Sequence, residues 1–164
     1  MGIVKFHFGL DPRTGSLVGG GLQIILGPMF FIFGICSNWF LFGWPLWAGN
    51  SICFVYFLIC LVAGLLLLCG SFLYKPSYVL IHQMASAIGT VLLIAYLIMT
   101  SWIIHEFEQM TIEQLHKLRN YETYILSIIA LLGFLVCLIL QVYLIIGSRI
   151  FYRKLKTGEI KSGI

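Results

Sequence analysis

The residues of this sequence that could form a polar site are a few neutral side chains set in long apolar stretches. Gln23, His82 and Gln141 each lie near one end of such a stretch, and Gln83 follows His82 directly. A helix rises about 1.5 Å per residue, so these side chains fall in one layer, roughly 6 to 9 Å inside the same face of a membrane. Such a layer can fix helix register through hydrogen bonds, at about 0.6 to 2 kcal/mol per bond. The alternative is a polar pocket for a lipid head group or a small molecule.

Motifs for catalysis are missing. The sequence contains no HExxH, no Gly-x-Ser-x-Gly, no Walker loop and no Cys-x-x-Cys motif. His105, Glu106, Glu108 and His116 lie in one acidic segment, which is more typical of a solvated surface than of a metal site. We therefore expect no enzyme activity, no cofactor and no metal ion. The predicted spans also lack the intramembrane charge that an ion-coupled carrier usually needs.

The composition predicts an integral membrane protein. Hydrophobic residues make up 60% of the 164 residues and charged residues 10%, with a mean hydropathy of +1.01. A soluble domain carries about 25% charged residues, so this chain cannot coat a water-soluble surface. Its net charge of +4 is scattered and forms no basic stripe. The composition therefore excludes a soluble enzyme and a nucleic-acid partner.

Four stretches are long enough to cross a hydrocarbon core of about 30 Å, which takes roughly 20 helical residues. They cover residues 17–39, 51–74, 78–104 and 123–147, with a tail at 148–164. The sequence therefore predicts an all-α fold, a four-helix transmembrane bundle in a single domain over residues 1–164, with short loops. No signal peptide is recognisable, so the first span is expected to act as its own insertion signal.

Basic residues set the expected orientation, because Lys and Arg resist translocation when they lie close to a span. With both termini in the cytosol, Lys117 and Arg119 are the basic residues left on the outer side, and the others are cytosolic. We therefore expect both termini to be cytosolic.

The outer connections are short and too small to fold as domains. The first carries Trp39, Trp44 and Trp47. These tryptophans fit an aromatic belt at the water interface, or a docking ridge for another membrane protein. In the second connection, Thr111 and Gln114 form a capping-box pattern that predicts a short interfacial helix.

Cysteine and small residues suggest how the helices are joined. Cys36 and Cys53 lie at the outer ends of two helices, where an oxidising compartment would permit a disulfide. Small residues four apart let helices approach closely in lipid. Such pairs, Gly15 with Gly19 and Ala85 with Gly89, predict close packing within the chain or against a partner.

The tail carries short signals. Tyr152 and Leu155 fit a tyrosine-based endocytic pattern, and the terminal Ser162-Gly163-Ile164 fits a minimal ligand for a PDZ domain. A basic cluster beside the fourth span would attract an anionic leaflet or follow from topology alone.

The chain resembles a family of short insect four-span proteins in three of its segments. Arg13-Thr14-Gly15 leads into the first span, Tyr74-Lys75-Pro76 forms a tight turn, and the fourth span runs out through YLIIGSRIFYRK. These features resemble the Pasiflora and Fire-exit tetraspans of insect septate junctions, and more distantly the lysosome-associated four-span transmembrane family. The chain lacks the Pro-Pro-x-Tyr tail of that lysosomal family, so the resemblance favours a junctional role over a sorting adaptor.

We expect a non-enzymatic four-span protein that acts through lateral contacts in the assembly or maintenance of a septate-type cell–cell junction. Its partners would be membrane lipids, other integral membrane proteins and a PDZ or adaptor protein at the tail. The expected location is the lateral plasma membrane. The alternative is a late-endosomal or lysosomal membrane protein that assists transport or sorting.

Overall fold

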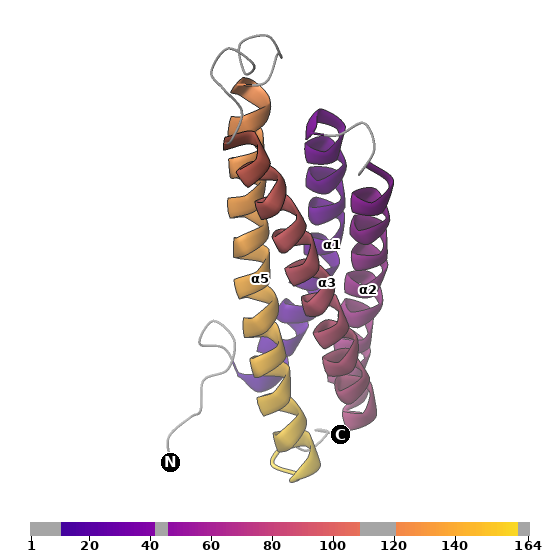
Figure 1. Ribbon diagram of the computed structural model, residues 1–164. Helices are drawn as coiled ribbons and strands as arrows, with labels where there is room; N and C mark the ends of the chain where they lie inside the picture. The colour runs from indigo at the N-terminus through magenta and orange to yellow at the C-terminus, as the bar shows by residue number, and fades with distance from the viewer. Residues whose placement is uncertain (1–10, 42–45, 109–120, 161–164) are drawn as a thin grey trace.

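The computed structural model describes residues 11–41, 46–108 and 121–160. These form four helices, α1 (Pro12–Leu41), α2 (Leu46–Leu73), α3 (Pro76–Glu108) and α5 (Tyr121–Lys156), and no strand occurs in them (Figure 1). Each helix contains a segment apolar and long enough to cross a membrane, namely Pro12–Ile35, Gly49–Leu73, Pro76–Trp102 and Leu131–Lys156. The predicted four-helix membrane bundle is confirmed. The predicted interfacial helix around Thr111 lies outside the described residues.

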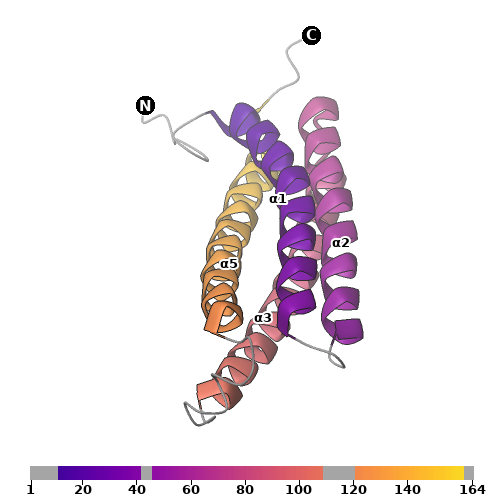
Figure 2. The ribbon, with the colours of Figure 1, turned by 90° about the horizontal axis from the view of Figure 1, so that it is seen from above.

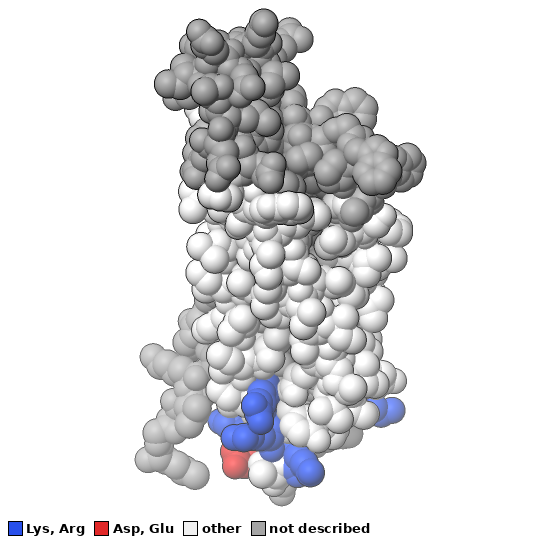
Figure 3. Space-filling model, in the orientation of Figure 1, with Lys and Arg blue, Asp and Glu red and all other residues white. Residues whose placement is uncertain are grey.

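The helices alternate in direction and form a ring. α1 packs against α2, α2 against α3, and α3 against α5, while α5 returns to α1 and closes the bundle (Figures 1 and 2). As a result, α1 begins and α5 ends at the same end of the bundle, where the turn between α2 and α3 also lies. We call this the basic end, because all the Lys and Arg side chains that the structure describes gather there (Figure 3).

The first helix begins five residues before the predicted span, at Pro12. Asp11 is its N-cap, because the backbone N–H groups of Arg13 and Thr14 donate to Oδ2 at 3.2 and 3.1 Å. Proline suits the first helical position, where its missing N–H costs no hydrogen bond. Hydrogen bonds from the Thr14 hydroxyl and backbone hold the pKa of Asp11 below its usual value.

Replacing Asp11 with Ala should fray the first turn of α1, since loss of an N-cap typically costs about 0.5–2 kcal/mol. The lowered pKa gives the cap a pH dependence. Its contribution is present above the unfolded pKa of about 3.9 and is lost as the pH falls through the folded value. The protection of the Arg13 and Thr14 amides against hydrogen exchange, measured relative to the intrinsic exchange rate at the same pH, should therefore fall in the variant at neutral pH, and in the parent under acid. Unchanged exchange in the variant would contradict this role.

The last helix also differs from the predicted span, because α5 continues to Lys156 instead of ending near 147. The Phe151 side chain is fully buried against Leu67 of α2 and Val79 of α3. Gly158 then ends the helix with a φ of 72° and donates to the Leu155 carbonyl, in a Schellman-type cap. The first part of the predicted tail 148–164 therefore continues α5, because Phe151 packs on α2 and α3.

Three glycines of α1 carry its contact with α2. Gly20, Gly27 and Gly34 recur every seven residues, the repeat of a left-handed helix pair. A Cβ at Gly20 would lie 3.0 Å from the Gly64 carbonyl oxygen, one at Gly27 would lie 3.0 Å from Cβ of Cys60, and one at Gly34 would strike Sγ of Cys53. The two backbones can approach this closely only because these positions have no side chain.

Of the predicted small-residue pairs, Gly15, Gly19 and Gly89 are buried and Ala85 is half-buried. A Cβ at Gly89 would lie 3.3 Å from Cγ2 of Ile59, so α3 lies close to α2 there. The four-residue pattern missed the seam of Gly20, Gly27 and Gly34, because its members are seven residues apart.

Candidate functional site

A hydrogen-bonded layer joins three helices in the interior of the bundle. Gln23 of α1 donates through Nε2 to Oγ of Ser86 on α3 at 3.0 Å, and more weakly to Oε1 of Gln141 on α5 at 3.5 Å. Gln141 in turn donates through Nε2 to the Ser86 carbonyl oxygen at 3.3 Å. All three side chains are fully buried. We call Gln23, Ser86 and Gln141 the amide layer.

His82 connects α3 to the remaining helix, α2. It lies one turn before Ser86 on α3, is fully buried, and places Nδ1 2.9 Å from the Ala63 carbonyl oxygen of α2. Nδ1 donates in this contact when it carries the ring proton. Gln23, His82 and Gln141 therefore face the bundle interior, and their polar contacts link all four helices.

The sequence predicted that Gln83 belongs to this layer, but Gln83 does not join it. It is half-buried, and its Nε2 has no hydrogen-bond partner among the described residues. Successive helical residues point about 100° apart, so a neighbour of His82 cannot share its direction.

Sequence reasoning missed Ser86, which is the centre of the layer. Its hydroxyl accepts from Gln23, while its carbonyl oxygen accepts from Gln141 and from the Thr90 hydroxyl. The spacing of four residues from His82 was the available signal, because residues four apart share a helix face. Gly89 lies beside the layer, since a Cβ there would lie 3.6 Å from Nε2 of Gln141.

An aromatic cluster fills the bundle about 10 Å further from the basic end, since Gln23 and Phe30 are seven residues apart. The cluster takes one ring from each helix. The Phe30 centroid lies 4.4 Å from that of Tyr56, and the Phe134 centroid lies 4.6 Å from Phe30 and 4.8 Å from Tyr96. All four residues are at most 2% exposed. Such tilted and edge-on contacts are favourable ring geometries. We call this set the aromatic core.

The remaining predicted site residues lie in the outer connection and in the tail. Trp44 lies outside the described residues, and so do the side chains of Trp39 and Trp47. Tyr152 and Leu155 lie in the last turns of α5 and pack, partly buried, against the cluster around Phe151. The sorting pattern is therefore part of a packed helix.

The structure does not bear out the suggested disulfide. Cys53 is a buried free thiol whose Sγ lies against Gly34 of α1. The side chain of Cys36 lies outside the described residues.

The chemistry of the site is that of neutral hydrogen bonding. The groups brought together are two amides, a hydroxyl and an imidazole, and no group of three metal-ligating side chains occurs among the residues that the structure describes. Because the side chains bond one another directly, these contacts favour the register-fixing interpretation over the polar pocket.

Replacing Gln141 with Leu should lower the free energy of unfolding by about 1–2 kcal/mol, because it removes a donor and an acceptor from the amide layer. Gln83→Leu is the matched control, since its Nε2 makes no hydrogen bond within the described chain. Denaturant titration in mild detergent would compare the two variants. Equal losses of stability would show that the layer contributes nothing beyond helix burial.

Comparison of the chain with protein-family models, with curated proteins and with solved structures gives no match.

Proposed function

We propose that this protein is a non-enzymatic four-span membrane protein that acts through lateral contacts with other integral membrane proteins. One observation carries the proposal: Gln23, Ser86 and Gln141 are turned inward and bonded to one another, while large apolar side chains cover much of the outward surface. Val62, Ile88 and Ile98, for example, are 50–66% exposed. The surface on which such a protein can meet partners is therefore the one that faces lipid.

The distribution of charge supports a cytosolic location for both termini. Arg13, Lys75, Arg149, Arg153, Lys154 and Lys156 all lie at the basic end (Figure 3). Lys and Arg near spans favour the cytosolic side, and α1 begins and α5 ends there. Protease digestion of tags at each end in intact cells tests this orientation, and cleavage of either tag would contradict it.

At a finer level, we propose a role in assembling or maintaining a septate-type cell–cell junction at the lateral plasma membrane. This assignment rests on the resemblance to insect septate-junction tetraspans. A late-endosomal or lysosomal protein that assists sorting is the second candidate, and the burial of Tyr152 and Leu155 in a helical cluster weakens its main support. A tagged copy in a polarised epithelium separates the two, because lateral signal supports the junction and vesicular signal in acidic compartments supports sorting.

If the outer tryptophans form a docking ridge, replacing Trp44 and Trp47 with Ala should reduce recovery of membrane partners at least tenfold, because buried aromatic anchors dominate interface energies. Insertion should be unaffected, since the described spans are untouched. The matched control is Trp102→Ala, on α3, whose side chain is 63% exposed. Co-purification from mild detergent at equal expression is the measurement. An unchanged partner profile would assign these tryptophans to an aromatic belt.

A further inference from the structure

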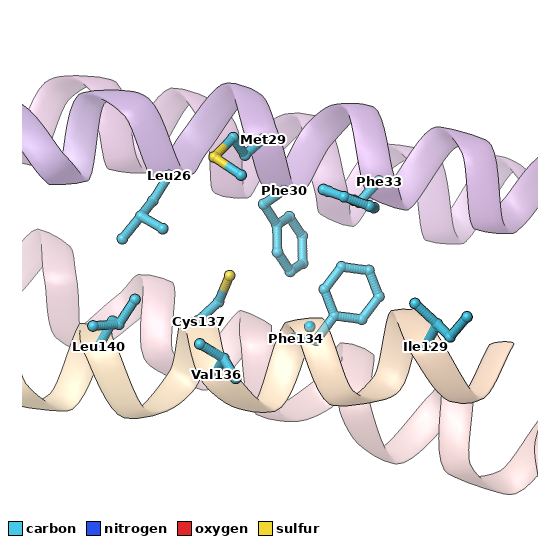
Figure 4. Close-up of a pocket in the computed structure, with 10 residues that line it drawn as sticks. Leu26, Met29, Phe30, Phe33, Ile129, Phe134, Val136, Cys137 and Leu140 are labelled. Atoms are coloured by element: carbon cyan, nitrogen blue, oxygen red, sulfur yellow. The ribbon is translucent and has the colours of Figure 1, made fainter. Parts of the chain in front are cut away.

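A groove runs along the side of the bundle between α1 and α5 (Figure 4). Its larger cavity, of about 360 Å³, lies between Met29 and Phe33 of α1 and Gly133 and Val136 of α5. A second cavity of about 230 Å³ lies nearer the basic end, beside Leu22, Tyr143 and Leu144. Leu26 and Leu140 line both cavities, so the two adjoin. We call them together the α1–α5 groove.

The groove follows from how α1 is held. Gly27 and Gly34 hold the second half of α1 against α2, whereas Gln23 ties its first half to α5. Pro28 lies inside the helix and cannot donate to the Ile24 carbonyl, which permits the bend seen in Figure 2. α1 therefore meets α5 near the basic end and leaves it further along.

The groove opens sideways and is closed at its back. Its rim residues Phe33 and Val136 are 53% and 55% exposed, so they also belong to the surface that would meet lipid. At the back, Phe30 and Phe134 are fully buried, with ring centroids 4.6 Å apart. The groove is thus continuous with the surrounding bilayer and separated from the rest of the aromatic core.

The lining favours a hydrocarbon chain over a sterol. It is almost entirely carbon, and a sterol hydroxyl buried there would need a hydrogen-bond partner. An acyl chain needs no polar partner, and it is much narrower than a helix, which is about 10–12 Å wide with its side chains.

The length of the groove fits one leaflet. Leu22 and Phe33 are eleven residues apart, or about 16 Å along α1, and half of a hydrocarbon core is about 15 Å. Gly133 supports the same occupant, because a Cβ there would meet nothing within 4 Å. No close contact between helices requires this glycine, in contrast to Gly20, Gly27 and Gly34, and it keeps the wall of the groove open.

The basic end supplies complementary charge for a head group. Lys154 is eleven residues from Tyr143, which is close to three full turns, so both positions lie on the same face of the helix. A phosphate at this level is attracted by the Lys154 ammonium group.

We propose that the α1–α5 groove binds one acyl chain of a glycerophospholipid from the leaflet at the basic end, with its anionic head group beside Lys154. The inference requires only that the four helices span a bilayer, and it does not depend on the lateral partners proposed above. If those partners did not exist, the proposed lipid site would be unaffected.

Photo-crosslinking in vesicles tests the proposal. The full chain is reconstituted into phosphatidylcholine containing a small fraction of phosphatidylserine that carries a diazirine on one acyl chain, and adducts are mapped by mass spectrometry. We expect several-fold more adducts on the groove segments 26–33 and 133–144 than on the outward Val62 and Leu65 of α2, which are 50% and 48% exposed. Uniform labelling of all lipid-facing residues would overturn the proposal.

Groove-filling variants provide the control. Gly133→Phe should lower the groove adducts at least threefold, whereas Gly21→Phe should not, because position 21 is equally free of neighbours but does not line the groove. Leu140→Trp, with its outward neighbour Ile139→Trp as control, repeats the test at the junction of the two cavities. Undiminished adducts in folded groove variants would overturn the proposal.

The head group is tested separately. The same diazirine chain on phosphatidylcholine should give at least twofold fewer groove adducts than on phosphatidylserine at low salt. Lys154→Ala should remove that difference. Equal yields from the two lipids would overturn the assignment of an anionic head group.

Discussion

Replacing Gly27 with Leu is expected to break the pairing of α1 with α2. A Cβ at this position would already lie 3.0 Å from Cβ of Cys60 and 3.3 Å from the Phe57 carbonyl oxygen, so the backbones must separate to admit the larger side chain. Overpacking a core typically costs about 1–3 kcal/mol. Here the cost should reach about 3 kcal/mol or more, because the seam continues through Gly20 and Gly34 and must open along its length. Denaturant titration in mild detergent, with size-exclusion profiles, measures the loss.

The control for this prediction is Gly21→Leu in the same helix. A Cβ at Gly21 would meet nothing within 4 Å, and both substitutions gain the same helix propensity over glycine. Gly21→Leu should therefore leave the free energy of unfolding unchanged or slightly raised. If Gly27→Leu behaved like Gly21→Leu, the close approach of α1 and α2 would be refuted.

Replacing Tyr96 with Ala should have the second largest effect. Tyr96 is 1% exposed, and its ring lies 4.8 Å from that of Phe134 and 5.6 Å from that of Phe30. Truncating a large buried aromatic residue costs about 3–5 kcal/mol in soluble cores, as lost transfer energy plus a cavity. In lipid the transfer part is small, because unpacked side chains also meet hydrocarbon, and the packing part remains. We therefore expect a loss near the lower bound, about 3 kcal/mol.

Ile98→Ala, two residues further along α3, is the comparison, since Ile98 is 66% exposed to the surroundings of the bundle. It should cost less than about 0.5 kcal/mol, as surface substitutions usually do. Tyr96→Phe keeps the ring and should restore most of the stability that Tyr96→Ala loses. Equal losses for Tyr96→Ala and Ile98→Ala would mean that the aromatic core does not hold the four helices together.

These two predictions concern different ways of holding helices in lipid. Water drives apolar side chains together in a soluble protein, but hydrocarbon outside a membrane bundle is as apolar as its interior. The seam of Gly20, Gly27 and Gly34 brings two backbones into contact, and the aromatic core fills the centre. The amide layer adds directional hydrogen bonds between helices. Each supplies close packing or hydrogen bonds that lipid cannot replace.

The sequence by itself determined that the chain crosses a membrane four times as helices. Runs of apolar residues without charge have no other way to satisfy their backbones in hydrocarbon, so length and hydropathy suffice. The inward orientation of Gln23, His82 and Gln141 was also predictable, because amides and imidazoles avoid lipid. The depth of a residue in the membrane depends on its position along one helix, because a rise of about 1.5 Å per residue converts that position into a depth.

The helix ends needed local contacts that hydropathy does not measure. Asp11 begins α1 through hydrogen bonds to its first turn, and Phe151 carries α5 beyond the expected boundary because it packs on Leu67 and Val79. Capping and packing add to a helix residues that are not themselves apolar, such as Arg13 and Arg149.

Only the tertiary structure decided which residues meet across helices. Ser86 is an ordinary serine in the sequence and becomes the centre of the amide layer, because α3 passes between Gln23 and Gln141. Likewise Gly27 carries a helix contact while Gly133 lines a groove, although both are glycines in apolar segments. Hydropathy fixes the depth of a residue but not its rotation toward a neighbour. That rotation is set by the contacts of all four helices at once.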